Sequence, residues 1–134
     1  MRPERVKAVV EDWSRKLRQH DVRFYVKDYR RINSDDGDLL YLDPPYKVNS
    51  PHAFYNGTID FSQFFNWLGK QQGDYLLSLN GLRDGQDWTV DVPDGLYDEH
   101  TFVPAGRSLL VRRNGNGGCE LQDSLYVRVA GGEI

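Results

Sequence analysis

The residues best suited to chemistry lie in one short stretch, Asp43, Pro44, Pro45 and Tyr46, which follows the apolar run at 39–42. Both prolines have a fixed φ and no N–H, and a residue that precedes proline favours an extended conformation. The Asp43 carboxylate and a proline carbonyl therefore form a rigid pair of acceptors, suited to an amino group with two N–H donors. The Tyr46 ring offers a flat surface for stacking. The pattern indicates a site for a planar amine, such as a base flipped out of a nucleic-acid helix.

An ordinary turn at the end of a strand would also explain these four residues, because Asp-Pro and Pro-Pro are common turn dipeptides. The surrounding sequence favours the chemical interpretation. An apolar strand precedes the stretch, an aromatic helix follows it, and a second apolar strand comes after the helix.

The expected elements begin with an amphipathic helix of about four turns that starts at Pro3. Residues 22–27 are β-prone and predict a strand. The run at 39–42 predicts a strand inside a parallel sheet with both faces covered. The apolar positions of the first helix share one face: Val6, Val9, Val10, Trp13 and Leu17.

A second helix is expected after Asp60, which with Gln63 forms a plausible N-terminal cap. Its apolar stripe predicts core residues at Phe61, Phe64, Phe65 and Leu68. Residues 74–81 predict another buried strand. Further strand candidates lie near 101–103, 107–113 and 124–129, and the last two would form a hairpin around 114–118.

This order of elements predicts a single α/β domain over residues 1–134, with a mostly parallel sheet and an antiparallel C-terminal hairpin. In such sheets ligands bind beyond the carboxyl ends of the strands. Asp43 lies at one of these ends, which is where a site would form.

Composition narrows the function classes. With 134 residues and a net charge of −3, the chain lacks the basic excess of a nucleic-acid binder that ignores sequence. No apolar run approaches the roughly 20 residues of a membrane span, and the N-terminus is too charged for a signal peptide, so a cytoplasmic protein is expected. Cys119 is the single cysteine, and the three histidines are scattered, so we expect no disulfide and no metal.

The motif "DPPY" after an apolar strand resembles the catalytic motif of adenine-specific DNA methyltransferases. The context "GDLLYLDPPY", followed by "FYNGTIDFSQFFNWL", is similar to the DNA adenine methylase (Dam-like) family. The resemblance implies a partial Rossmann-like sheet, DNA as the partner and S-adenosylmethionine as the methyl donor. It also implies that Asp43 and the Pro44 carbonyl accept hydrogen bonds from the adenine amino group. Tyr46 would stack on the flipped base, and Pro45 would fix the geometry of the turn.

Weaker matches extend the resemblance. The segment "VKDYRRI" is similar to the family's segment before the catalytic strand, which implies that Asp28 and Tyr29 contact the methyl donor, as Asp43 does. The segment "YLLSLNG" resembles the strand after the catalytic helix, with Ser78 and Asn80 near the pocket floor. Two loop aromatics, Phe54 and Tyr55, would line the base pocket, although packing on the core explains them equally well.

Residues 1–134 also depart from the family pattern. They contain neither its Phe-x-Gly-x-Gly turn, which holds the methyl donor, nor its helical DNA-reading insertion. The resemblance therefore covers the C-terminal catalytic half. We expect a second chain that carries the glycine-rich turn, or a homodimer through an uncovered sheet edge, and no membrane. Two alternatives stay open: a non-catalytic remnant or scaffold of this fold, and a methyltransferase for another planar amine, such as cytosine, an RNA base or a glutamine amide.

Overall fold

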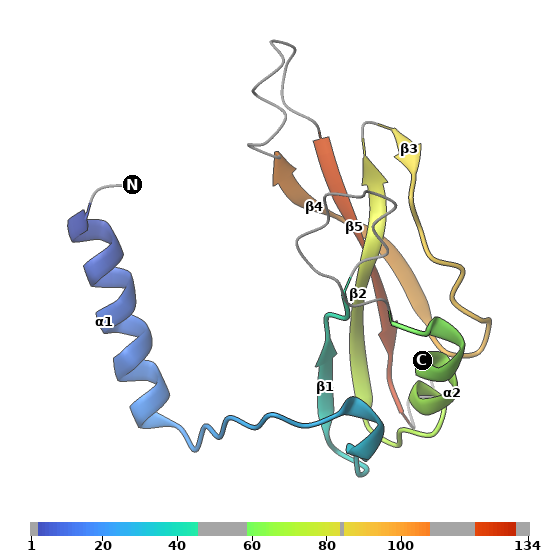
Figure 1. The fold of residues 1–134 in the computed structure, drawn as a ribbon, viewed down its shortest axis with the longest axis horizontal. Coiled ribbons are helices and arrows are strands. Elements are labelled where there is room, and N and C mark those ends of the chain that lie inside the picture. The colour runs from blue at the N-terminus through green and yellow to red at the C-terminus, as the bar shows by residue number, and fades with distance from the viewer. Residues whose placement is uncertain (1–2, 46–58, 84, 108–119, 131–134) are drawn as a thin grey trace. The chain divides into compact units, whose positions relative to one another are not determined.

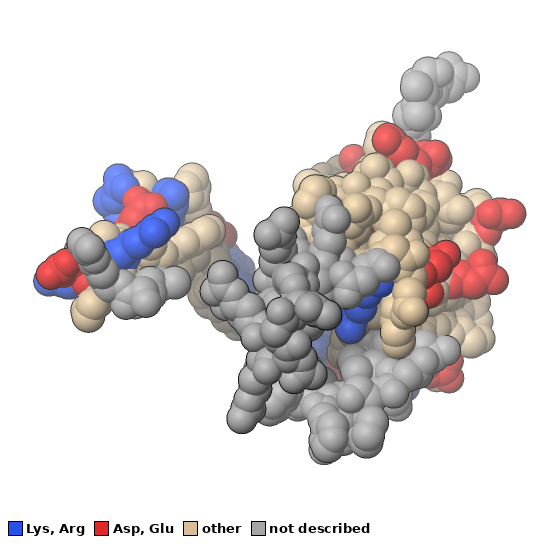
Figure 2. All heavy atoms as spheres, turned by 90° about the horizontal axis from the view of Figure 1, so that it is seen from above, with Lys and Arg blue, Asp and Glu red and all other residues tan. Residues whose placement is uncertain are grey.

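The computed structural model describes residues 3–45, 59–83, 85–107 and 120–130. The chain folds as two compact units, Met1–Arg31 and Ile32–Ile134. The first unit carries more Lys and Arg than Asp and Glu, and the second carries the reverse (Figure 2).

The first unit consists mainly of helix α1, Pro3–Gln19, which confirms the predicted N-terminal helix. Along its surface, Lys7 and Glu11 form an ion pair at 3.7 Å, and Asp12 pairs with both Arg15 and Lys16. Pairs three and four residues apart support a helix by a few tenths of a kcal/mol each. No residue of α1 is buried. Within this unit the apolar stripe from Val6 to Leu17 is exposed, and the ion pairs add local support to the helix.

The predicted strand at 22–27 is wrong. Residues 21–28 are in irregular conformation and all are exposed, and the short 3-10 helix η1, Tyr29–Arg31, follows them. A strand requires a neighbour that satisfies its backbone N–H and C=O groups, and residues 22–27 pair with no strand in the described part of the chain. β propensity alone therefore did not decide the structure of this segment.

The second unit is an α/β structure built on a mixed sheet (Figure 1). Along the described residues, strand order is β1-β2-β5-β4, and the short β3 also pairs with β2. Helix α2, Phe61–Leu68, connects β1 to β2, which are parallel. The strands are β1 Leu39–Leu42, β2 Asp74–Arg83, β3 Gln86–Asp87, β4 Glu99–Arg107 and β5 Glu120–Arg128.

The expectation of a mostly parallel sheet is wrong. Of the strand pairs that the described residues form, only β1 with β2 is parallel, and the others are antiparallel. The reason is the position of β5, which runs opposite to β2 and β4 and lies between them. An antiparallel C-terminal pair is confirmed, and in the described residues β5 pairs with β4, Glu99–Arg107. The predicted partner strand at 107–113 lies, apart from Arg107, outside the described residues.

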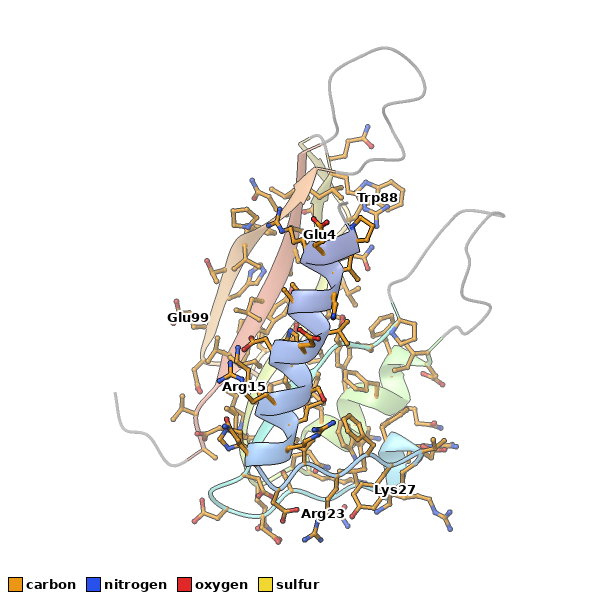
Figure 3. The ribbon with its side chains drawn as sticks, turned by 90° about the vertical axis from the view of Figure 1, so that its left-hand side faces the viewer. Glu4, Arg15, Arg23, Lys27, Trp88 and Glu99 are labelled. Atoms are coloured by element: carbon orange, nitrogen blue, oxygen red, sulfur yellow. The ribbon has the colours of Figure 1, made fainter. Side chains whose placement is uncertain are left out.

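Helix α2 covers one face of the sheet (Figures 1 and 3). The Asp60 carboxylate accepts the Gln63 N–H at 3.1 Å, as the predicted cap requires, and the helix ends at Gly69. Buried side chains of α2 and β2 form the core: Phe64, Phe65, Trp67, Leu68, Tyr75, Leu77 and Leu79. The predicted core of α2 is therefore confirmed except for Phe61, which is half-buried.

The opposite face is less covered. Side chains alternate between the two faces of a strand, so Leu39 and Tyr41 lie opposite the face that α2 covers. They are 68% and 67% exposed. On the same face, Leu76 and Leu125 are half-buried. The expectation that both faces of β1 are covered is therefore wrong for the described residues.

Candidate functional site

The predicted site lies where β1 ends beside the longer β2. Leu42 is opposite Leu77 in the last β1–β2 pair, so Asp43 and Ser78 are the residues that directly follow this pair on the two chains. The structure therefore places Asp43 at the carboxyl end of a parallel strand, as predicted. Asp43 and Pro45 are exposed, and Pro44 is half-buried. The remaining predicted residues of this loop, Tyr46, Phe54 and Tyr55, lie outside the described residues.

Beyond the end of β1, the adjacent edge of β2 has a short open stretch. Strand β2 has two edges. One edge pairs with β5, and the other edge pairs with β1 and, further along, with β3. There β3 begins to pair only at Leu82, and the Trp88 N–H donates to the Gly81 carbonyl at 3.0 Å. No described strand pairs with this edge over residues 78–80.

Two predicted substrate-binding residues lie on this stretch of β2. Ser78 is 7% exposed and Asn80 is 3% exposed. Because Leu77 and Leu79 point to the face that α2 covers, Ser78 and Asn80 point to the opposite face. The structure therefore brings Asp43, Ser78 and Asn80 to one region, which the resemblance predicted.

A β-bulge next to Asn80 was missed by sequence reasoning. The β2–β5 register shifts between Asn80 and Leu82, at Gly81. A Cβ added to Gly81 would lie 2.3 Å from the backbone oxygen of Gln122, so no larger residue fits. Bulges are common beside functional sites, where they redirect a side chain. The available signal was a glycine inside an apolar strand, in "LLSLNG".

The side chain of Asn80 has an unusual environment. Its Oδ1 is buried and accepts no hydrogen bond from the residues that the structure describes. Asp123 of β5 lies opposite Asn80 and is partly exposed on the same face. Together with Asp43, these groups present carboxylate and amide oxygens, which favour a ligand that donates hydrogen bonds.

The proposed contacts to the methyl donor, Asp28 and Tyr29, belong to the first unit and are described there alone. The Asp28 carboxylate accepts the Arg30 backbone N–H at 3.0 Å and forms an ion pair with the Arg30 guanidinium at 2.6 Å. These hydrogen bonds lower the pKa of Asp28 to about 2. Much of the acceptor capacity of Asp28 is therefore already used within its own turn, which does not favour the predicted contact with a ligand.

A hydrogen-bond network at the other end of β1 and β2 fixes the register that places Asp43. The Gln71 side-chain oxygen accepts the Ser34 N–H at 2.9 Å, and the Ser34 hydroxyl accepts the Gly73 N–H at 3.1 Å. Next to them, the Asp74 N–H donates to the Asp38 carbonyl at 2.9 Å. This network ties the chain before β1 to the chain before β2. No local sequence pattern indicates it, because its members are 36 to 39 positions apart.

Two kinds of feature are absent from the described ranges. The side chains placed there hold no group of three His, Cys, Asp or Glu residues that could bind a metal ion. Within the same ranges, no helix is both long and apolar enough to cross a membrane.

Acceptor oxygens of Asp43, Asn80 and Asp123 thus lie near the carboxyl end of β1 on one face of the sheet. No protein-family model matches the chain, and no curated protein or solved structure matches it either.

Proposed function

We propose that this protein is an adenine-specific DNA methyltransferase, or the catalytic part of one, that transfers a methyl group from S-adenosylmethionine to the exocyclic amino group of adenine. The observation that carries the proposal is the position of Asp43. Asp43 directly follows the last residue of a parallel strand and precedes two prolines, and it comes one position after the last β1–β2 pair, as Ser78 does on the neighbouring strand. Ligands of α/β sheets bind at such strand ends.

The chemistry of this position supports methylation of an amine. As the amino nitrogen attacks the methyl group, positive charge develops on that nitrogen. A fixed carboxylate and a fixed carbonyl stabilise this charge more strongly in the transition state than in the ground state, and this difference accelerates the reaction. Asp43 and the Pro44 carbonyl supply the two acceptors, and Tyr46 supplies the stacking surface. Adenine as the substrate base is inferred from the family resemblance, because the two acceptors alone suit any planar amine.

The methyl donor fits the described residues in part. When bound, it supplies the electrophilic methyl group. Asp43 and the acceptor oxygens near Asn80 suit the cationic part of the donor, whereas Asp28 is already paired with Arg30. We therefore propose that a second chain with a glycine-rich turn supplies further donor contacts.

The test is methylation of DNA by the full chain, with N6-methyladenine measured by mass spectrometry. Wild-type protein should convert adenine in unmethylated duplex DNA. Asp43→Ala should lower the rate at least a hundredfold, which is the usual effect of removing an electrostatic contact to a transition state. Thermal unfolding of this variant should be unchanged, because Asp43 is exposed.

Asp36→Ala is the matched control, since it removes an exposed carboxylate before β1. Its rate should equal that of the wild type. Equal rates for the Asp43 and Asp36 variants would remove the catalytic role of Asp43. If wild-type protein is inactive on DNA even in cell extract that contains candidate partner chains, the non-catalytic scaffold would replace the enzyme as the best interpretation.

A further inference from the structure

The Asn80 side chain carries an acceptor atom that the described residues do not satisfy. Asn80 is 3% exposed, and its Oδ1 accepts no hydrogen bond from the described residues. A buried acceptor without a donor destabilises a folded protein. Such groups are few in native proteins, and a binding role is one explanation for a group of this kind at the edge of a site.

The backbone around Asn80 provides an independent observation. The register shift between Asn80 and Leu82 follows Asn80 directly, and the close approach of the Gln122 carbonyl requires glycine at position 81. An uninterrupted ladder would hold this part of β2 as an ordinary central strand. The bulge instead interrupts the regular β2–β5 pairing directly after a buried, unsatisfied amide, before the pairing resumes at Leu82. Bulges next to functional sites change the direction of a side chain in this way.

We propose that Asn80 is a ligand-binding residue whose side-chain carbonyl accepts a hydrogen bond from a positively charged amine, bound beyond the end of β1. The unsatisfied atom is an acceptor, so its partner must be a donor. The neighbouring Asp123 carboxylate, which is partly exposed on the same face, favours a cationic donor over a neutral one.

The identity of this amine rests on the proposed function: in a methyltransferase it is the ammonium group of S-adenosylmethionine. Asp43 and Ser78 directly follow the last β1–β2 pair, and Asn80 lies two residues beyond Ser78 on β2, roughly 7 Å along the strand from Ser78. This separation leaves Asp43 to accept the substrate amino group while Asn80 holds a second amine. Asn80 is thus a specificity residue for the donor and does not contact the methyl acceptor.

The test compares two adenosine thioethers by isothermal titration into the full chain. One is 5′-deoxy-5′-(3-aminopropylthio)adenosine, which carries a primary amine, and the other is 5′-methylthioadenosine, which does not. The amine-bearing compound should bind wild-type protein at least tenfold more tightly. Asn80→Leu should remove this preference, whereas Asn80→Asp, which keeps an acceptor oxygen, should retain it.

A second readout needs no ligand. Since Asn80→Leu removes an unsatisfied acceptor, we expect its Tm to rise by a few degrees. Asn66→Leu, at an exposed position of α2, controls for the added apolar side chain and should keep both the tenfold preference and its Tm within about one degree of the wild type. A lower Tm for Asn80→Leu, combined with an unchanged amine preference, would show that Oδ1 serves the fold and would overturn the inference.

The two thioethers also separate this inference from the proposed function. If both bind equally to wild-type protein and to Asn80→Leu, an adenosine site exists and the amine site does not. If 1,3-diaminopropane alone raises the Tm of wild-type protein but not of Asn80→Leu, and neither nucleoside does better, the amine site holds and the methyl-donor assignment falls. Absence of any binding by the two thioethers and the diamine overturns the amine site.

Discussion

The side-chain oxygen of Gln71 accepts the backbone N–H of Ser34 at 2.9 Å and so connects two loops that lie 37 positions apart. The same side chain donates to the Trp67 carbonyl at 3.0 Å, and the Gln71 backbone carbonyl accepts from the Arg128 guanidinium at 3.2 Å. Gln71 is 3% exposed. One buried residue thus links the chain before β1, the end of α2 and strand β5, at the end of the sheet opposite to Asp43.

Gln71→Ala should therefore destabilise the protein markedly. The substitution leaves the buried Ser34 N–H without its acceptor, and an unsatisfied buried group costs about 1–3 kcal/mol. The free energy of unfolding, measured with urea, should fall by this amount. Gln72→Ala is the matched control, because Gln72 is exposed and adjacent, and its effect should stay within about 0.5 kcal/mol. Equal losses for the two variants would contradict a role for the network.

Gly81→Ala should be more harmful than Gly69→Ala. At position 81 the new Cβ would meet the backbone oxygen of Gln122 at 2.3 Å, and backbone cannot give way cheaply. At position 69 it would meet the end of the flexible Leu96 side chain at 3.3 Å. We expect Gly81→Ala to lower the free energy of unfolding by about 1–3 kcal/mol or more, as overpacking does, and Gly69→Ala to change it by less than half as much. A neutral Gly81→Ala would mean that the bulge relaxes freely.

Asp28 should titrate with an unusually low pKa of about 2, because Arg30 donates to its carboxylate from both the side chain and the backbone. A carboxyl group whose pKa is depressed by folding stabilises the folded turn above its unfolded pKa, about 3.9, and loses this contribution as the pH falls toward 2. NMR titration of the Asp28 carboxyl carbon measures the value directly. Arg30→Ala should raise the pKa, and Arg31→Ala should raise it less, since the charge of Arg31 is the smaller cause. If Arg31→Ala raises the pKa of Asp28 more than Arg30→Ala does, Arg30 is not the main cause of the low pKa.

Patterns of neighbouring residues correctly predicted helix α2 and strands β1 and β2. Helix α2 has its own cap at Asp60, and its stripe of Phe64, Phe65 and Leu68 specifies one buried face, so the sequence was sufficient. Strands β1 and β2 were also predictable, because each is a short apolar run next to a turn.

Features that depend on partners distant in the sequence were not predictable. Residues 22–27 have strand propensity but pair with no described strand, and propensity cannot supply the missing hydrogen bonds. The insertion of β5 between β2 and β4 reversed the expected pairing, although the hairpin itself was predicted. At the site, "DPPY" located Asp43, whereas the unsatisfied Oδ1 of Asn80 became visible only from the burial that the folded sheet imposes.

Strand β1 should mediate self-association through its outer edge. Among the described strands, only β2 pairs with β1, so no described strand occupies its other edge. Natural edge strands usually carry Pro or Lys, which hinder pairing with another chain. The opposite edge strand, β4, contains Pro104, but β1 contains only Leu and Tyr, and Tyr41 is 67% exposed.

We therefore expect sedimentation velocity at micromolar concentration to show a dimer or larger species. Tyr41→Lys should shift the protein toward monomer, because two copies of the added charge would repel each other at a paired edge, whereas Thr101→Lys on β4 should leave the association unchanged. Dissociation by both variants would indicate a general effect of charge, and a wild-type monomer would show that the edge of β1 does not pair with a second copy.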